Sequence, residues 1–331
     1  MMKVSICITY YNQENFVRQS LDSVFAIDFP CEYEVLCHDD GSNDNTRGIL
    51  ELYEQKHVGK LKCYIQERNE NEKSINRASA SRLRLAEKAS GDFILFLDGD
   101  DYYCNTQFIK EALLILLQNT SIAACAFNYK YLMQDGTYKE IAQNIPKGIN
   151  KAKDYIKNRC YTHSGAIVFR NYLNRERLNL LKSINNFDDN AITIYFLQFG
   201  DLYFFDKTVY VYRQTNDSLW NSISLMERNI IEAMDYRMIL ESAPKFGCML
   251  AARLYPAFRF LYKHKKDNDN LGERRDKYLQ KIMEHGDCFL AGLLRWRSLT
   301  SLEKLLVRCM WLIYKVKAGK YNFILKANRC Q

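Results

Sequence analysis

Three clusters of polar and acidic residues carry the chemistry that the sequence offers. The densest, Asp98-Gly99-Asp100-Asp101, directly follows the apolar run FILFL. Three neighbouring carboxylates repel one another, and a hard divalent cation that also binds phosphate is the simplest compensation. An acidic loop before a helix N-terminus would show the same pattern without a metal. The cluster therefore predicts either a cation site or a helix-capping loop, and both interpretations stay open at this point.

A second cluster, DDGSNDNT, begins at Asp39. Its glycine and serine permit a tight turn, and Asp44 or Asn45 could cap the helix that follows. An acid at a strand end can accept hydrogen bonds from a base or a ribose, as in dinucleotide-binding folds. Neither GxGxxG nor GxxxxGKS/T occurs in the sequence, so a Rossmann cofactor site and a P-loop are not supported.

The elements that position these clusters alternate between short apolar strands and helices. Such alternation indicates βαβ units and a parallel sheet, in which ligands bind beyond the carboxyl ends of the strands. The segments 9–12, 39–42 and 98–101 each follow a strand, so three loops should meet at one edge of the sheet. Strands are expected at residues 4–9, 33–37, 61–65 and 93–97, and helices at 15–26, 45–53 and 77–89.

The pattern changes after Asp101. The dipeptide Asp135-Gly136 marks a turn between two apolar segments, which favours a mixed or antiparallel extension of the sheet. From about residue 225 the spacing is helical, with a loop near 263–272. Further strands are expected at residues 122–131, 138–141, 165–169, 202–205 and 208–212, and helices at 107–117 and 189–198.

Composition and charge bound the class of protein. Of the 331 residues, 47% are hydrophobic and 13% aromatic, which excludes disorder as the main state. The net charge is +8, but residues 226–331 alone hold 21 Lys and Arg against 11 Asp and Glu, so the front part is slightly acidic. A basic rear part suits an anionic partner such as a membrane surface or nucleic acid. Eleven scattered cysteines without a CxxC pair favour the cytosol, and we expect neither secretion nor a membrane-spanning helix.

The segment at residues 299–317 has the spacing of an amphipathic helix. Apolar residues recur at intervals of three and four, and cations gather beside them. Such a helix can lie on an anionic bilayer, or it can pack on the protein with its basic side in water. The apolar residues are Leu302, Leu305, Leu306, Cys309, Met310 and Ile313, the cations are Lys304, Arg308, Lys315 and Lys317, and the aromatic residues of interfacial type are Trp296, Trp311 and Tyr314.

Three segments in this order resemble the family 2 glycosyltransferases: VSICITYYNQENFVRQSLDSV, YEVLCHDDGSNDNT and GDFILFLDGDD. The likeness covers nearly all of the first hundred residues and continues more weakly to about residue 215. It implies the GT-A (Rossmann-like) α/β fold, a mostly parallel sheet flanked by helices, here with an α-helical C-terminal extension. The catalytic domain would span residues 1–224, with a nucleotide-binding half (1–104) and an acceptor-binding half (105–224), followed by a basic helical region at 225–331.

The resemblance also implies a reaction and a binding site. Such enzymes transfer a sugar from a nucleoside diphosphate sugar with inversion, assisted by Mn²⁺ or Mg²⁺. Asp98 and Asp100 would form the DxD pair, and Asp100 or Asp101 would hold the metal. Gly99 stands where Ser is frequent in the family, and no acid is lost. The implied nucleotide-binding residues are Thr9, Tyr11, Asn12, Asp39, Asp40, Ser42, Arg77, Arg82, Asp98 and Asp100.

Inverting transfer also needs a carboxylate that takes the proton of the acceptor hydroxyl. The pair Asp188-Asp189 fills the place of the family's base, with Asp189 as first choice and Asp188 as second. Alternatively, Asp188 caps the next helix and Asp189 is an acid of its first turn. His163 could touch the diphosphate or acceptor, or be structural. Arg213 could pair with phosphate or with a structural carboxylate.

We therefore expect an enzyme with a UDP-sugar donor and a glycan or lipid-linked saccharide acceptor, acting in surface polysaccharide assembly. We expect it in the cytoplasm, peripheral on the inner face of the cell membrane, with the C-terminal region against anionic lipid. A nucleotidyltransferase that makes activated sugars is one alternative, but it would want a Gly-rich basic loop where this chain has YYNQ. A nucleic-acid-binding protein is the other, and its basic residues form no recognisable motif, so no nucleic-acid partner is expected.

Overall fold

The structure is a computed structural model. It describes residues 2–67, 77–158, 160–184, 186–214, 224–267, 279–280, 282–283 and 288–327, without the side chains of 321–327. Internal contacts divide the chain into two compact units, Met1–Asp217 and Ser218–Gln331. The sequence predicts the change from α/β to helical structure at residue 225.

The first unit is built on a sheet of ten described strands, with the main order β3-β2-β1-β4-β9-β6-β10-β5. Strands β3, β2, β1 and β4 are parallel neighbours, β9 is antiparallel to β4 and β6, and β10 is parallel to β6. The short strands β5, β7 and β8 add antiparallel pairings. The strands are β1 Lys3–Tyr10, β2 Glu32–Asp39, β3 Leu61–Ile65, β4 Phe93–Asp98, β5 Tyr102–Tyr103, β6 Ile122–Leu132, β7 Tyr138–Glu140, β8 Gly148–Asn150, β9 Ile167–Arg170 and β10 Asp201–Arg213.

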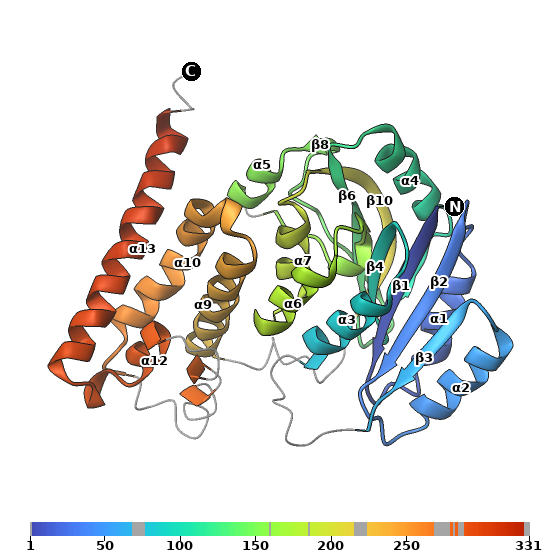
Figure 1. Cartoon of the computed structure of the whole chain (residues 1–331), viewed down its shortest axis with the longest axis horizontal. Coiled ribbons are helices and arrows are strands. Elements are labelled where there is room, and N and C mark those ends of the chain that lie inside the picture. Colours follow the sequence, from blue (N-terminus) through green and yellow to red (C-terminus); the bar gives the residue numbers. More distant parts are fainter. Residues whose placement is uncertain are drawn as a thin grey trace. The chain divides into compact units, whose positions relative to one another are not determined.

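Helices cover both faces of this sheet (Figure 1). Helices α1, α2 and α4 lie on one side, and α3, α6 and α7 lie on the other. The predicted α/β fold with a mixed extension is confirmed. The helices are α1 Val17–Phe25, α2 Thr46–Lys56, α3 Arg77–Lys88, α4 Phe108–Gln118, α5 Ala152–Lys157, α6 Arg175–Ile184 and α7 Asp189–Phe196.

The central strands are continuous apolar runs because both of their faces are covered. In β4, every residue except the last is buried. Ile6 and Ile8 of β1 join the core that α1, α2 and α4 close. On the other face, Phe96 of β4 meets Phe187 edge to face, with ring centroids 5.4 Å apart. This two-sided packing holds the strands, and therefore fixes where the loops at their carboxyl ends begin.

Strand β10 is a single strand where the sequence predicts two. Its pairing with β6 shifts register between Phe205 and Thr208. Asp206 in this bulge accepts a hydrogen bond from Asn128 Nδ2 at 2.6 Å. The polar pair Asp206-Lys207 suggests the end of a strand in the sequence, but in the structure the strand continues through it as a β-bulge. The sequence does not predict α5, α6, β5 or β8. Of these, α5, β5 and β8 are too short to show a clear hydrophobic period.

The second unit is helical. Its described α-helices are α9 Leu225–Ser242, α10 Gly247–Lys263, α12 Cys288–Leu294 and α13 Ser301–Ala327. A capping box begins α9, in which Ser224 and Glu227 bond each other's backbone amides. In the described parts of the chain, none of the helices combines the length and apolarity needed to cross a bilayer.

The aromatic residues near α13 pack inside this unit. Trp296 and Tyr314 are only 7% and 5% exposed. Trp311 stacks on Tyr262 of α10, with centroids 5.3 Å apart. Of the two interpretations left open for these aromatic residues, their packing supports the one in which they lie against the protein, because they fill the seam between α10 and α13.

Candidate active site

The ends of β1, β2 and β4 lie side by side, as the sequence predicts. Thr9 of β1 is opposite His38 of β2 and Asp98 of β4, and Tyr10 is opposite Asp39. The three polar clusters therefore follow one edge of the parallel sheet, the edge at which such folds bind ligands.

Hydrogen bonds join the loops after β1 and β2 into one rim. The Asn12 amide donates to Ser42 Oγ at 2.8 Å, and Asn12 Oδ1 accepts from the Asn43 amide at 2.9 Å. Ser42 also donates to Asp39 through its hydroxyl and its amide. Burial raises the pKa of Asp39 above its ordinary value, although the hydrogen bonds from Ser42 act to lower it. Tyr11, in the loop after β1, is 39% exposed.

The helix-capping interpretation of the second cluster accounts for part of it. Asn45 occupies the N-cap position of α2 but makes no side-chain cap bond. Asp44 instead accepts from the Thr46 amide at 2.9 Å and from the Glu14 amide at 3.0 Å. Asp44 is therefore structural, whereas Asp39, the last residue of β2, and Asp40, which follows it, are buried at 1% and 7% exposure.

In the loop after β4, Asp101 is structural. Its carboxylate is 1% exposed and accepts hydrogen bonds from the Tyr210 hydroxyl and, at 2.7 Å, from the Arg213 amide. Both donors come from β10, so Asp101 ties this loop to the sheet. This arrangement contradicts Asp101 as a metal ligand, because its oxygens are buried and already bonded.

Asp100 differs from Asp101 in being incompletely bonded. The one described hydrogen-bond donor to its carboxylate is its own backbone amide. Burial and the negative charge of Asp98 raise the pKa of Asp100 to about 6, and His163 and Arg213 oppose this effect only in part. A carboxylate that is both desolvated and close to a like charge is stabilised by a cation.

Arg213 holds this loop in place. Its Nε donates to the backbone oxygen of Asp100 at 2.8 Å, and its Nη2 donates to Gln19 Oε1 at 2.7 Å. Its guanidinium also lies over the ring of Phe16, 4.5 Å from the centroid. Of the two partners that the sequence leaves open for Arg213, a structural carboxylate forms no ion pair with its guanidinium among the described residues, and a phosphate stays a prediction.

Arg82, from α3, connects the two acidic parts of the site. Its Nη2 lies 2.6 Å from Asp98 Oδ1, and its Nη1 lies 3.3 Å from Asp188 Oδ1. Nη2 is also 3.9 Å from Asp189 Oδ1. The Arg82 side chain is only 6% exposed. It thus supplies a buried positive charge between the end of β4 and the start of α7.

Asp188 and Asp189 stand at the start of α7 in different surroundings. Asp188 occupies the N-cap position, but its side chain makes no cap bond and turns to Arg82. Asp189 Oδ1 accepts from Ser164 Oγ at 2.5 Å, and its Oδ2 accepts from the Tyr161 hydroxyl at 3.5 Å. The two acids therefore have separate partners, and neither acts as a simple helix cap.

These surroundings shift the two pKa values in opposite directions. Desolvation raises the pKa of Asp188 even though its side chain is still 49% exposed, and the charges of Asp189 and Asp98 add to this despite Arg82. Burial also disfavours the charged form of Asp189. The attraction of His163 and Arg82, with the hydrogen bonds from Ser164 and Tyr161, outweighs burial and lowers the pKa of Asp189. Asp189 is thus the more readily ionised acid of the pair.

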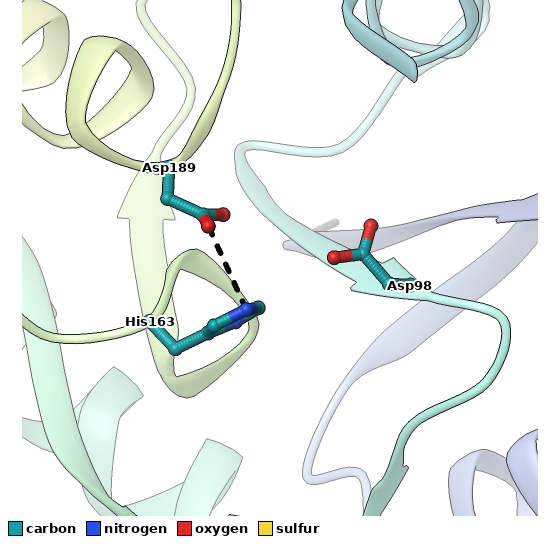
Figure 2. A group of neighbouring side chains, drawn as sticks. All are labelled: Asp98, His163 and Asp189. Atoms are coloured by element: carbon teal, nitrogen blue, oxygen red, sulfur yellow. Dashed lines mark ion pairs between the residues drawn. The ribbon is translucent and has the colours of Figure 1, made fainter. Parts of the chain in front are cut away.

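His163 faces Asp189 across 3.6 Å, measured from Nε2 to Oδ2 (Figure 2). Its Nδ1 accepts a hydrogen bond from the Gly165 amide at 3.2 Å, which assigns the proton of a neutral imidazole to Nε2, the atom that faces Asp189. The ring is 3% exposed and stacks on Tyr210, with centroids 4.8 Å apart. His163 therefore lies in the site and is held there by aromatic packing.

Asp98, His163 and Asp189 are also a geometric candidate for metal binding, since their ligand atoms lie within 4.8 Å of one another. Figure 2 shows the Asp98 carboxylate directed toward the other two side chains from the end of β4. However, Arg82 already lies 2.6 Å from Asp98 and 3.9 Å from Asp189, and freeing Nε2 of a neutral His163 for a metal would move its proton to Nδ1, which now accepts from the Gly165 amide. Asp100 is the acid whose charge is left uncompensated by such a neighbour.

The structure brings together residues that are far apart in the sequence. Arg82, Asp98, His163, Asp188 and Asp189 form one network, and Arg77 begins the helix that carries Arg82. The sequence assigns no role to four supporting residues, because each acts through a contact with a residue more than 20 positions away. They are Gln19, Tyr161, Ser164 and Tyr210.

Curated relatives match the front part of the chain. The poly(ribitol-phosphate) β-N-acetylglucosaminyltransferase TarS of Staphylococcus aureus is 35% identical over 113 residues, which is 34% of this chain and 18% of TarS. A poly(ribitol-phosphate) β-glucosyltransferase of Bacillus spizizenii is 35% identical over 102 residues, 30% of this chain and 15% of that enzyme. The putative teichuronic acid biosynthesis glycosyltransferase TuaG of Bacillus subtilis is 28% identical over 158 residues, 47% of this chain and 57% of TuaG. These matches therefore span well under two thirds of each relative.

The fold has solved counterparts. The crystal structure of residues 1–349 of S. aureus TarS with UDP-GlcNAc aligns with 97% of this chain and 92% of that one, at 20% identity and a TM-score of 0.56. The likeness confirms the GT-A type of fold predicted for the chain. The sequence model of "Glycosyl transferase family 2" matches residues 5–176, a little over half of the chain. The strand-end site, the fold and this match agree, and the chain belongs to glycosyl transferase family 2 and is a glycosyltransferase.

Proposed function

We propose that this enzyme transfers a sugar with inversion from a nucleoside diphosphate sugar to a hydroxyl group of a saccharide acceptor. UDP is the proposed nucleotide, and Asp189 is the proposed general base. The observation that carries the proposal is the contrast in contacts within the acidic pair: Ser164 and Tyr161 donate to the Asp189 carboxylate and His163 faces it, whereas Asp188 pairs with Arg82.

A general base in this reaction must be ionised and must face the acceptor hydroxyl. Ser164, Tyr161 and His163 surround the Asp189 carboxylate, so its orientation is set before the acceptor arrives. Asp98, at the end of β4, lies across the same network. A sugar held at this strand end would therefore have Asp189 on one side and the nucleotide-binding rim on the other.

The bond changes follow from this placement. Asp189 takes the proton of the acceptor hydroxyl as the hydroxyl oxygen forms a bond to the anomeric carbon. The bond between that carbon and the donor phosphate oxygen breaks, and its electron pair stays on the departing nucleoside diphosphate. Attack opposite the leaving group inverts the configuration at the anomeric carbon.

Among the acids of the site, Asp100 fits the expected divalent cation best. Asp100 offers carboxylate oxygen, the ligand type that Mn²⁺ and Mg²⁺ prefer, and its raised pKa reflects a charge that needs compensation. A bound cation would neutralise the charge that develops on the diphosphate. Arg213 keeps the Asp100 backbone in position, and Asp101 anchors the same loop to β10.

The proposed substrates draw on the relatives. TarS is named as a transferase of N-acetylglucosamine to poly(ribitol-phosphate), and its structural counterpart contains UDP-GlcNAc. Relatives from Bacillus are named for a poly(ribitol-phosphate) glucosyltransferase and for teichuronic acid biosynthesis. We therefore propose a UDP-hexose or UDP-N-acetylhexosamine donor and a glycan or lipid-linked saccharide acceptor that belongs to a cell-surface polysaccharide.

The test is a panel of UDP-, GDP- and dTDP-sugars with Mn²⁺, in which release of nucleoside diphosphate is measured. The expected result is release from a UDP-sugar, followed by transfer to an oligosaccharide acceptor with inverted anomeric configuration in the proton NMR spectrum. Release of pyrophosphate instead would indicate the nucleotidyltransferase alternative, and retained configuration would contradict the role of Asp189.

A further inference from the structure

The outward side of α13 is a stripe of apolar residues that no described part of the chain covers. Leu302 is 67% exposed, and Leu305, Leu306, Leu312, Ile313 and Val316 are between 49% and 58% exposed. Their spacing of one, three and four residues places them on one side of a helix. With the exposed Cys309, the outer stripe consists of Leu302, Leu305, Leu306, Cys309, Leu312, Ile313 and Val316.

The opposite side of α13 is the one that packs on its own unit. Val307, Tyr314 and Ala318 are 4%, 5% and 3% exposed. Tyr314 meets Phe258 of α10 edge to face, with centroids 5.0 Å apart. The core of this unit is therefore closed by the inner side of α13, and the outer stripe is not needed for it.

A hollow of about 480 Å³ adjoins the stripe at Leu306, which belongs to both. Most of its lining is apolar, but two cations, Arg237 and Arg295, and one acid, Glu303, also line it. Nε of Arg295 is buried and has no hydrogen-bond partner. The apolar surface thus extends beyond one helix and carries cationic groups at its margin.

Cations border the outer stripe almost to the exclusion of acids. Between residues 302 and 320 there are five cations, Lys304, Arg308, Lys315, Lys317 and Lys320, and the only acid is Glu303. Glu303 is already bonded to the amide and hydroxyl of Thr300, where it helps to begin the helix. The stripe therefore offers apolar side chains between uncompensated positive charges.

We infer that the outer stripe of α13 seats this enzyme on the surface of an anionic lipid bilayer. The leucines and isoleucine enter the boundary between headgroups and acyl chains, and the flanking cations contact lipid phosphates. A second copy of the chain fits less well, because two such stripes would bring their cations together without acids to pair with them. The inference does not depend on the proposed chemistry of transfer.

The test uses the full chain with liposomes of phosphatidylcholine alone or with 30% phosphatidylglycerol, and co-sedimentation as the readout. The stripe variant is Leu305→Gln/Leu312→Gln. The matched control is Leu114→Gln/Leu117→Gln on α4, where the two leucines are 54% and 55% exposed, close to the 54% and 50% of Leu305 and Leu312. Both variants change two exposed leucines of one helix, so both should stay folded.

We expect the wild type and the control to bind the anionic liposomes, and the stripe variant to bind at least tenfold more weakly. Raising the NaCl concentration from 0.1 to 0.5 M should weaken wild-type binding, and liposomes without phosphatidylglycerol should bind little. Equal binding of the stripe variant and the wild type would overturn the inference. A second result would also overturn it: the wild-type protein does not bind the liposomes and, by light scattering, forms a dimer that the stripe variant does not form.

Discussion

The hydrogen bond from Ser164 to Asp189 gives the sharpest prediction about the base. The Ser164 hydroxyl lies 2.5 Å from Asp189 Oδ1 and is one of the groups that lower the pKa of Asp189. It stabilises the ionised carboxylate more than the protonated form, because a hydrogen bond to a charged acceptor is stronger than one to a neutral acceptor. Ser164→Ala should therefore raise the pKa of Asp189 and leave the base itself in place.

The size of the shift follows from the hydrogen bond. A hydrogen bond to a charged group contributes about 1.5–3 kcal/mol, and one pKa unit corresponds to about 1.4 kcal/mol, so the upper bound is about 1–2 units. The Asp189 side chain is 27% exposed and keeps His163, Tyr161 and Arg82 in the variant. Water can replace part of the lost interaction, so a rise of about one unit is expected.

The assay is the pH dependence of kcat for sugar transfer, from pH 4 to pH 8. Transfer needs ionised Asp189, so activity falls as the pH drops through its pKa, and Ser164→Ala should move this acid limb to higher pH by about one unit. Activity near pH 8 should change little. Ser183→Ala on α6, which removes a hydroxyl bonded only to the Leu180 carbonyl, is the matched control and should leave the limb in place. An unmoved limb in Ser164→Ala, or one moved to lower pH, would refute the reasoning.

Three further predictions concern the rest of the site. Arg82→Gln removes the cation between Asp98 and Asp188 and should lower the free energy of unfolding, measured in urea, by about 2 kcal/mol. The loss is smaller than for a fully buried pair because both acids are partly exposed. An unchanged free energy of unfolding would contradict this prediction. Gly99→Ala would place a Cβ against the Tyr10 ring, closer than side chains pack. A loss of about 1–3 kcal/mol is expected in thermal unfolding, and an unchanged melting temperature would contradict this crowding. Excess EDTA should abolish transfer and added Mn²⁺ or Mg²⁺ should restore it, and full activity in EDTA would exclude the proposed cation.

Much of the first unit follows from the sequence because its strands are buried on both faces. The apolar runs that become β1, β2, β3 and β4 are bounded by charged or turn-forming residues, so the predicted and observed limits differ by two residues at most. The convergence of three loops at one edge then follows from parallel pairing alone. Here the local sequence and the global fold agree.

The roles within the site could not be predicted in this way. Asp98, Asp100 and Asp101 look alike in the sequence, yet one pairs with Arg82, one is left with its own amide and one is bonded to β10. These differences depend on contacts between residues up to 112 positions apart. Neither spacing nor composition reports such contacts in a single sequence.

The C-terminal unit shows a third situation. The sequence predicts an amphipathic helix and leaves open whether its apolar side faces the protein or a membrane. In the structure, Val307, Tyr314 and Ala318 form the inner side, and the more apolar outer stripe is exposed. The periodicity is correct, but it cannot tell which of two apolar sides packs on the neighbouring helix, because that depends on the shape of α10 and α12.

The most direct test of the account compares Asp189→Asn with Asp188→Asn in sugar transfer. Both substitutions remove one charge from the same network and keep the size of the side chain. If Asp189 is the base, Asp189→Asn should lower kcat by about 10²–10⁴-fold with little change in UDP binding, and Asp188→Asn should lower it far less. Wild-type kcat in Asp189→Asn, or an equal loss in both variants, would contradict the assignment of the base.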